Sequence, residues 1–312
     1  MYQMDLVSVI VPFLNEAACI TQYCDFINHF SKDKPFDVEV VFVDDGSTDD
    51  TDAVIASYAF THCRAVKLIQ LSKNYGSHAA IRAGIVHATG DYITYVGADL
   101  QEPDEMVTAM YEAIKGGLDA VYVEKKRIKV NPVNRACSLL YSAMMRRWAV
   151  KDYGAGGINN IMFNRKIRDY LNENIEANSS LMLQIVDAGF RSVTIEMDYK
   201  NRVGGVSKWT FGKKVKLFID SFVTFSFMPI RFVSIMGLLM FFAGIGFGAF
   251  TIVTRILNPG VAAGFATLAS LLAIGFGITN ISLGIVAEYL WRTFDAARNR
   301  PVFLISEVKG IK

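Results

Sequence analysis

The sequence predicts an α/β protein with a mostly parallel sheet, followed by a helical hairpin long enough to cross a membrane. Short apolar runs alternate with segments of helical character up to residue 124. Two of these runs, 38–43 and 92–96, lead directly into acidic loops. Beyond residue 231 the chain carries two long stretches without charge. Strands that alternate with helices build parallel sheets, and long uncharged apolar stretches build membrane spans.

The expected elements follow one another in regular order. Residues 6–11 form an apolar run that Pro12 is expected to end, and a helix follows Asn15 and Glu16, with Asn15 as its cap. The other expected strands are 38–43, 66–71, 92–96 and 120–124, and the other expected helices are 50–59, 78–88 and 103–115. Because parallel strands need crossover connections, we expect helices on both faces of the sheet.

Two uncharged segments predict transmembrane helices near 230–254 and 264–288. No charge lies between Arg231 and Arg255 or within 256–287, and Asn258-Pro259-Gly260 separates the two segments. A bilayer core needs about 20 apolar residues. The alternative is a buried hairpin in a soluble protein, in which helices rarely stay uncharged for this length.

Lys and Arg predict that both flanks of the hairpin are cytoplasmic. The loop between the spans carries only Arg255, whereas both flanks are rich in basic residues. The N-terminal sequence leads directly into a strand pattern and shows no signal peptide. We therefore expect an integral protein of the bacterial inner (cytoplasmic) membrane, with the head and both termini in the cytoplasm.

Two segments, 134–149 and 208–225, mix aromatic, aliphatic and basic residues as interface helices do. Core-facing helices are the alternative for both. The expected domains are a head (1–200), an amphipathic juxtamembrane segment (201–229), two transmembrane helices (230–290) and a cytoplasmic tail (291–312). A glycine face at Gly244, Gly246 and Gly248 permits a homo-oligomer, but it serves packing within the hairpin equally well.

Several function classes lose support. A net charge of +2 is too balanced to indicate nucleic acid, so we expect no such partner. The chain has no GxxxxGK[ST], no GxGxxG after a strand and no HExxH, which argues against P-loop, dinucleotide and zinc-protease chemistry.

Carboxylates at strand ends are the strongest functional signal. Asp44 and Asp45 follow one apolar run, and Asp99 follows another. Ligands of open parallel sheets bind at the carboxyl ends of strands, where carboxylates suit a ribose, a base edge or a cation bound to phosphate. The alternative for Asp44 and Asp45 is helix capping and loop hydrogen bonding.

A family resemblance is carried by Pro12-Phe13-Leu14-Asn15-Glu16, Val43-Asp44-Asp45-Gly46-Ser47 and Ala98-Asp99-Leu100-Gln101-Glu102-Pro103. It extends to Ser72-Lys73-Asn74-Tyr75-Gly76, to 202–208, and to the two spans with Glu288-Tyr289 and Arg292. Over almost its whole length the chain resembles the inverting family 2 glycosyltransferases, specifically the polyprenyl-phosphate branch. Bactoprenol glucosyltransferases and dolichol-phosphate mannose synthases belong to that branch.

The resemblance implies a GT-A type head that transfers a sugar from a nucleotide-diphosphate sugar donor to a polyprenyl phosphate, here undecaprenyl phosphate, at a lipid bilayer. It implies Mg²⁺ or Mn²⁺, held by Asp99 and Gln101. The implied donor-binding residues are Pro12, Asn15, Glu16, Asp44, Asp45, Lys73, Asn74, Gly76 and Ala98. The implied catalytic residues are Asp99, Gln101, Asn159, Arg202 and Lys208. Arg202 and Lys208 would balance diphosphate charge; attraction to membrane headgroups is their alternative role.

Two positions depart from the family pattern. Gly97 replaces the first acid of Asp-x-Asp, and Asn159 replaces the acid of a Gly-Asp-Phe-Arg-like stretch. A phosphate monoester with a second pKa of about 6 is largely dianionic near neutrality, so it can attack without a general base. The loss at Gly97 weakens expected metal binding or makes room for a different sugar.

Two other functions stay open. The missing acids suit a catalytically weakened head that binds a nucleotide sugar or a protein partner. A polysaccharide synthase is the second, but it needs Gln-x-x-Arg-Trp and more spans, whereas Met144 stands three residues before Arg147.

Overall fold

The computed structural model describes residues 4–98, 100–126, 143–144, 146–147, 158–176, 180–199, 228–257, 264–298 and 300–312. Two compact units make up the chain: Met1–Ser221 together with Pro301–Lys312, and Phe222–Arg300. Asp99, Arg202 and Lys208 lie outside the described residues, as do the expected helix 208–225 and most of 134–149.

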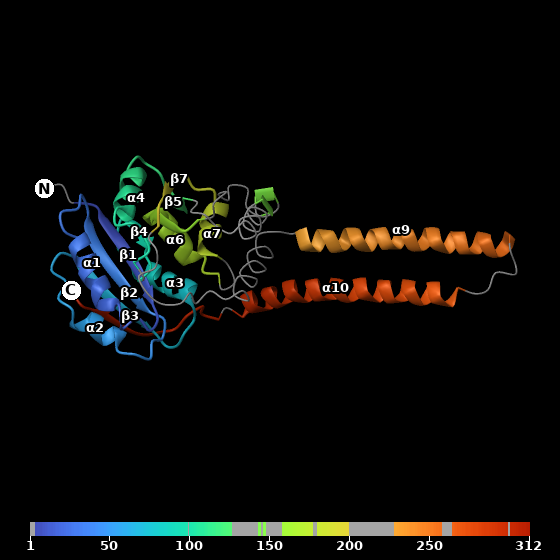
Figure 1. Ribbon diagram of the computed structural model, residues 1–312, viewed down its shortest axis with the longest axis horizontal. Coiled ribbons are helices and arrows are strands. Elements are labelled where there is room, and N and C mark those ends of the chain that lie inside the picture. The colour runs from blue at the N-terminus through green and yellow to red at the C-terminus, as the bar shows by residue number, and fades with distance from the viewer. Residues whose placement is uncertain are drawn as a thin grey trace. The chain divides into compact units, whose positions relative to one another are not determined.

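The first unit is built on an eight-stranded mixed sheet with the order β7-β5-β6-β4-β1-β2-β3-β8 (Figure 1). The strands are β1 (Leu6–Phe13), β2 (Asp37–Asp44), β3 (Ala65–Leu71), β4 (Tyr92–Tyr95), β5 (Ala120–Lys125), β6 (Asn160–Asn164), β7 (Ser192–Met197) and β8 (Ile305–Gly310). β1 to β4 are parallel, and β7 is parallel to β5. β6 is antiparallel to both its neighbours, and β8 is antiparallel to β3. The predicted mostly parallel sheet is confirmed.

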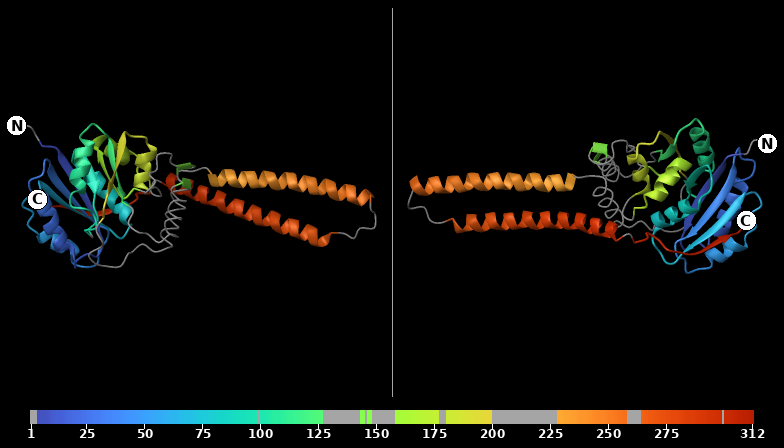
Figure 2. Two further views of the ribbon diagram at one scale, coloured as in Figure 1. Left: turned by 45° about the horizontal axis from the view of Figure 1, so that its top comes forward. Right: turned by 180° about the vertical axis from the view of Figure 1, so that it is seen from behind.

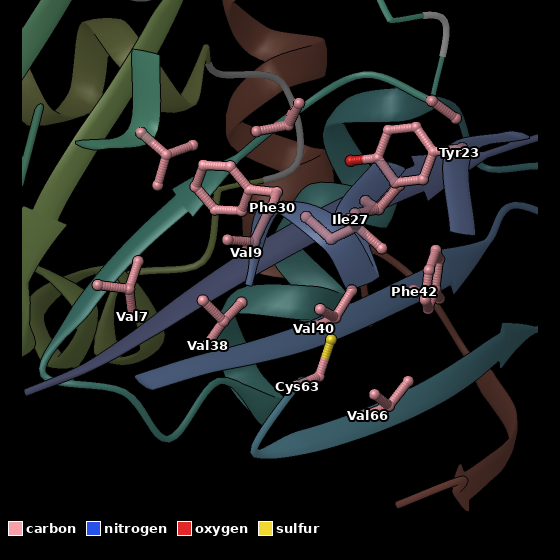
Figure 3. Close-up of a cluster of buried hydrophobic side chains, with 14 of the residues drawn as sticks. Val7, Val9, Tyr23, Ile27, Phe30, Val38, Val40, Phe42, Cys63 and Val66 are labelled. Atoms are coloured by element: carbon pink, nitrogen blue, oxygen red, sulfur yellow. The ribbon is translucent and has the colours of Figure 1, made fainter. Parts of the chain in front are cut away.

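Helices cover both faces of this sheet. α1 (Ile20–Phe30), α2 (Thr51–Ser57) and α4 (Met106–Ile114) share one apolar core with the strands. Figure 3 shows Tyr23, Ile27 and Phe30 of α1 gathered over alternate residues of β1 and β2. On the other face lie α3 (Ser77–His87), α6 (Arg165–Glu173) and α7 (Leu181–Asp187).

A missing side chain lets α3 approach the sheet closely. A Cβ built on Gly84 would lie 2.4 Å from Cγ2 of Ile10 in β1 and 3.2 Å from Cγ2 of Val43 in β2. Real Cβ atoms do not tolerate the shorter distance, so any larger residue would push α3 outward. α3 begins beside the carboxyl end of β2, since its N-cap residue Gly76 donates its N–H to Asp45 at 2.9 Å.

β1 does not end before Pro12, as the sequence analysis expected, but continues to Phe13. Pro12 pairs with Val43 in the register, and β1 pairs with β4 only as far as Ile10. Val96 donates to the carbonyl of Ile10, so the backbone groups of Ile10 and, two residues on, Pro12 face the β4 side. Pro12 lies past the end of β4, where its missing N–H costs no ladder hydrogen bond.

The expected cap at Asn15 is also wrong. α1 begins at Ile20 with Cys19 as its N-cap residue. Asn15 has a φ of 53° and accepts a hydrogen bond from Thr48, so it belongs to the loop contacts of the sheet edge.

Residues 301–312, expected within a cytoplasmic tail, return to the sheet of the first unit (red in Figure 1). β8 forms the edge strand beside β3, with Leu68 paired to Lys309 and Leu71 to Ile305. The first unit is therefore completed by residues from the far end of the chain.

The second unit contains α9 (Met228–Leu257) and α10 (Phe265–Ala297), which lie side by side (Figures 1 and 2). Ile230–Thr254 and Ile274–Ala297 are long and apolar enough to cross a membrane, by length and composition. The two predicted apolar helices are confirmed, although the second candidate span begins ten residues after the expected 264. Arg292 donates to Glu288 within α10 at 2.8 Å, which pairs charges one helical turn apart.

Candidate functional site at the carboxyl edge of the sheet

Asp44 and Asp45 occupy the carboxyl end of β2, beside the end of β1. The register pairs Phe13 with Asp44, and Asp45 donates its N–H to the carbonyl of Phe13 at 3.0 Å. Both carboxylates are buried, with 5% and 4% exposed surface. Burial raises the pKa of each carboxyl above its usual range, although backbone N–H bonds act in the opposite sense.

Asp44 and Asn15 organise one turn from two sides. The N–H of Ser47 donates to Oδ1 of Asp44 at 2.7 Å. Asn15 donates its N–H to Oγ of Ser47 at 2.9 Å and accepts from the N–H of Thr48 at 2.8 Å. The segment after β1 and the turn after β2 are thus held as one surface.

Glu16 continues this contact between the two segments. Its N–H donates to Oγ1 of Thr51 at 3.0 Å, at the first residue of α2. Pro12, Asn15, Glu16 and Asp44, which the sequence analysis assigned to donor binding, therefore lie together at the same edge.

Asp45 supports the loop 72–76, which we call the donor loop because the family resemblance predicts donor-binding residues in it. Its Oδ1 accepts from the N–H of Tyr75 at 2.8 Å, and its Oδ2 accepts from the N–H of Gly76 at 2.9 Å. Gly46 has a φ of +78°, and a Cβ there would lie 2.6 Å from the carbonyl carbon of Lys73. Asp45 and Gly76 are brought to the expected site, where they fix the loop that carries exposed Lys73 and Asn74.

The end of β4 carries Gly97, Ala98 and Gln101. Gly97 donates its N–H to Oε1 of Glu102 at 3.1 Å, and Leu100 has a φ of 53°. No group of three His, Cys, Asp or Glu side chains suited to a metal occurs among the described residues, which do not include Asp99. Asp99 and Gln101 offer oxygen donors, which fit a hard cation.

Asn159 lies next to the same edge because β6 runs antiparallel to β4. Its Oδ1 accepts from the N–H of Lys125 at 3.2 Å, and its carbonyl accepts from Oη of Tyr95 at 3.1 Å. The side chain at the position of the family acid is thus hydrogen-bonded to the end of β5.

A buried polar cluster beside Asn159 was not anticipated. Asn160 donates from Nδ2 to the carbonyl of Tyr95 at 2.9 Å and accepts from Oη of Tyr199 at 2.6 Å. Burial raises the pKa of Tyr95 and of Tyr199, so both phenols stay protonated as hydrogen-bond donors. The only sign of this cluster in the sequence is the pair Asn159-Asn160, which precedes the apolar run 161–163.

Comparison with known proteins finds a matching family model and relatives over nearly the whole chain. Residues 8–180 match the family model "Glycosyl transferase family 2". The chain is 27% identical to the undecaprenyl-phosphate 4-deoxy-4-formamido-L-arabinose transferase of Proteus mirabilis, over 99% of this chain and 96% of that protein. It is also 27% identical to the prophage bactoprenol glucosyl transferase homolog of Escherichia coli, over 97% and 99% of the two chains.

Among solved structures, the mannosyltransferase PcManGT of Pyrobaculum calidifontis, in complex with GDP-Man and Mn²⁺, superposes with a TM-score of 0.50. The two proteins share 19% identity, and the match covers 95% of this chain and 88% of the other. This likeness confirms the expected GT-A type fold.

Proposed function

The chain belongs to glycosyl transferase family 2, and we propose that it transfers a sugar from a nucleotide-diphosphate sugar to a polyprenyl phosphate such as undecaprenyl phosphate. Relatives named for undecaprenyl-phosphate and bactoprenol transfer match nearly the whole chain, the apolar hairpin included, and so support this acceptor class. The observation that carries the proposal is the buried carboxylate of Asp44 at the carboxyl end of a central parallel strand.

Asp44 is suited to hold the nucleoside. Ser47 fixes its Oδ1, and we assign Oδ2 to a ribose hydroxyl or a base N–H of the donor. A charge-assisted hydrogen bond in a water-poor site is stronger than a neutral one. Asn15 and Glu16 complete this part of the site on the β1 side, and Lys73 and Asn74 border it on the donor loop.

The reaction is a single displacement with inversion. An oxygen of the acceptor phosphate attacks the anomeric carbon while the bond from that carbon to the diphosphate oxygen breaks. We assign Asp99 and Gln101 to a Mg²⁺ or Mn²⁺ ion, which when bound would neutralise charge on the leaving diphosphate. Arg202 and Lys208 add positive charge for the same group. Because a dianionic acceptor phosphate needs no general base, we assign Asn159 a positioning role.

The connectivity supports a hairpin that crosses the membrane twice. Met1–Ser221, which precedes the hairpin, and Pro301–Lys312, which follows it, both belong to the first unit. A chain that leaves this unit and returns to it crosses a bilayer an even number of times. The Lys and Arg excess on both flanks supports a cytoplasmic head.

The test uses the purified full chain in lipid nanodiscs with Mg²⁺ or Mn²⁺, undecaprenyl phosphate and a panel of nucleotide sugars, with glycolipid products identified by mass spectrometry. We expect one donor to give a glycosylated polyprenyl phosphate. The Asp44→Ala variant should lose the product. Absence of product with every donor would overturn the proposal, and calorimetry would then show whether the chain only binds nucleotide sugars.

A further inference from the structure

The C-terminal segment, Pro301–Lys312, forms hydrogen bonds with both ends of β3. At the start of β3, Val66 donates to the carbonyl of Lys312 at 3.0 Å and accepts from the N–H of Ile311 at 2.8 Å. At the other end, Oγ of Ser306 donates to the carbonyl of Gln70 at 3.0 Å. The register shifts between Gln70 and Leu71, so the regular ladder is interrupted just before the donor loop.

One further hydrogen bond lies beyond this irregularity. Ser72, the first residue of the donor loop, donates its N–H to the carbonyl of Leu304 at 2.9 Å. The C-terminal segment therefore contacts the donor loop itself as well as the strand that precedes it.

The donor loop in turn touches the acidic turn after β2. The backbone of Lys73 and Asn74 packs against Gly46 so closely that a Cβ at Gly46 would lie within 2.7 Å of both. Asp45 fixes the following residues through the N–H groups of Tyr75 and Gly76. A displacement at Ser72 would be passed to Asp45 and Gly46, next to Asp44.

Burial alone does not explain this arrangement. Leu304 is 53% exposed, and every residue of β8 after Ile305 is exposed. The segment gains little from the hydrophobic effect at these positions, and its backbone hydrogen bonds are its main contacts there. The segment also follows directly on α10, which ends at Ala297.

We propose that Leu304 and Ser72 form a positioning pair through which the segment after α10 holds the donor loop in its nucleotide-binding conformation. The inference rests on the proposed function, since it concerns how donor-binding residues are placed. It makes donor affinity dependent on a segment that touches no substrate and continues directly from a candidate membrane helix.

Two matched substitutions in the full chain test the pair. Leu304→Gly loosens the backbone that accepts from Ser72, and Lys309→Gly makes the same kind of change in β8 opposite Leu68. Both side chains project from the C-terminal segment with substantial exposure. Isothermal titration calorimetry measures the affinity for UDP and for GDP with Mg²⁺ or Mn²⁺, in detergent, and hydrogen–deuterium exchange measures protection of the donor loop.

We expect Leu304→Gly to weaken binding of the nucleotide by about five-fold, the size of one backbone hydrogen bond, and to speed exchange in 72–76. Lys309→Gly should lower the melting temperature by a similar amount, but it should leave the nucleotide affinity and the exchange rate in 72–76 nearly unchanged. Equal losses of affinity in both variants, or unchanged exchange in 72–76 for Leu304→Gly, would overturn the inference. A wild-type chain that binds no nucleotide would instead count against the proposed function, while the exchange measurement still decides the coupling.

Discussion

Nη2 of Arg82 on α3 donates a 2.7 Å hydrogen bond to Oε1 of Gln184 on α7, joining two buried side chains 102 residues apart in the sequence. The amide of Gln184 is used at both ends, because its Nε2 donates to the carbonyl of Asn174 at 2.7 Å, just after α6. Burial lowers the pKa of Arg82, and the carboxylate of Glu176 opposes this at longer range. Arg82 and Gln184 thus link α3, α7 and the end of α6 through two hydrogen bonds.

Removing the acceptor from this link should cost more than removing both partners. Gln184→Leu leaves the Arg82 guanidinium buried without that acceptor, and we expect a loss of about 3 kcal/mol. The double variant Arg82→Met with Gln184→Leu replaces the pair by apolar groups and should recover much of the loss. Thermal unfolding in detergent measures the stability of the wild type, the two single variants and the double variant. If the losses of the two single variants simply add up in the double variant, the prediction is wrong.

Glu39 lies buried in β2 at the opposite end of the strand from Asp44. It accepts from Nζ of Lys67 at 2.8 Å, from the N–H of Thr89 at 2.8 Å and from Oγ of Ser8. Burial acts to raise the pKa of Glu39, but these hydrogen bonds prevail and hold it below its usual value of 4.5. The network joins β1, β2, β3 and the end of α3.

The sign of this shift predicts an acid-sensitive contribution to stability. A carboxyl whose pKa is lower in the folded state stabilises the fold fully above its unfolded pKa, and this contribution disappears as pH falls through the folded value. Glu39→Gln should therefore lower the melting temperature at pH 7 and flatten its decline below about pH 4.5. A melting curve that shifts equally at pH 7 and pH 3 would contradict this assignment.

The sequence was most informative where strands are buried on both faces. β1 to β5 were predicted within a few residues, because a central parallel strand is a continuous apolar run. β8 was missed, since Ile305–Gly310 is an exposed edge strand defined by its pairing with β3. β7 is similarly exposed along most of its length. The local sequence of β7 or β8 does not indicate which distant strand it pairs with.

The same distinction applies to the site. The position of Asp44 was expected from the rule that ligands of parallel sheets bind at the carboxyl ends of strands, whereas Asn15 was assigned to the site only through the family resemblance. The contacts around Asn160 join β6 and β4 to Tyr199 just beyond β7, so no single motif contains them. Pro12 was misjudged because the cost of a proline depends on whether a neighbouring strand extends beside it, which is a property of the assembled sheet.

Gly46 and Gly117 offer a matched test of the donor loop. Both have positive φ, +78° and +91°, but a Cβ on Gly117 meets nothing within 4 Å, whereas one on Gly46 meets the backbone of Lys73 and Asn74. Gly117→Ala should cost about 1 kcal/mol of stability from backbone strain alone. Gly46→Ala should cost more and also weaken nucleotide binding at least ten-fold, because the loop must move. Nucleotide titrations of both variants check this; equal affinities would show that the loop does not contribute.

The buried charge of Asp44 should lower the stability of the fold while favouring nucleotide binding. Its pKa is raised in the folded state, so ionisation opposes folding at neutral pH, and this penalty is relieved as pH falls. Asp44→Asn keeps a side-chain oxygen for the N–H of Ser47 and removes the buried charge. We expect a higher melting temperature at pH 7. We also expect at least a ten-fold loss of nucleotide affinity, because the variant lacks the charged carboxylate that would accept a hydrogen bond from the nucleotide. A variant that melts earlier and binds as before would contradict both assignments.

Asn159→Asp separates positioning from base catalysis. A carboxylate at this position can still accept from the N–H of Lys125, so the fold should be unchanged. If the acceptor phosphate attacks as a dianion, turnover should rise with pH through about pH 6 and then level, in the wild type and the variant alike. The maximal rates should differ by less than about ten-fold, since general base catalysis alone is worth about 10²–10⁴. A variant that gains a hundred-fold, with a pH profile moved to that of a new carboxylate, would show that the natural chain lacks a base that the reaction uses.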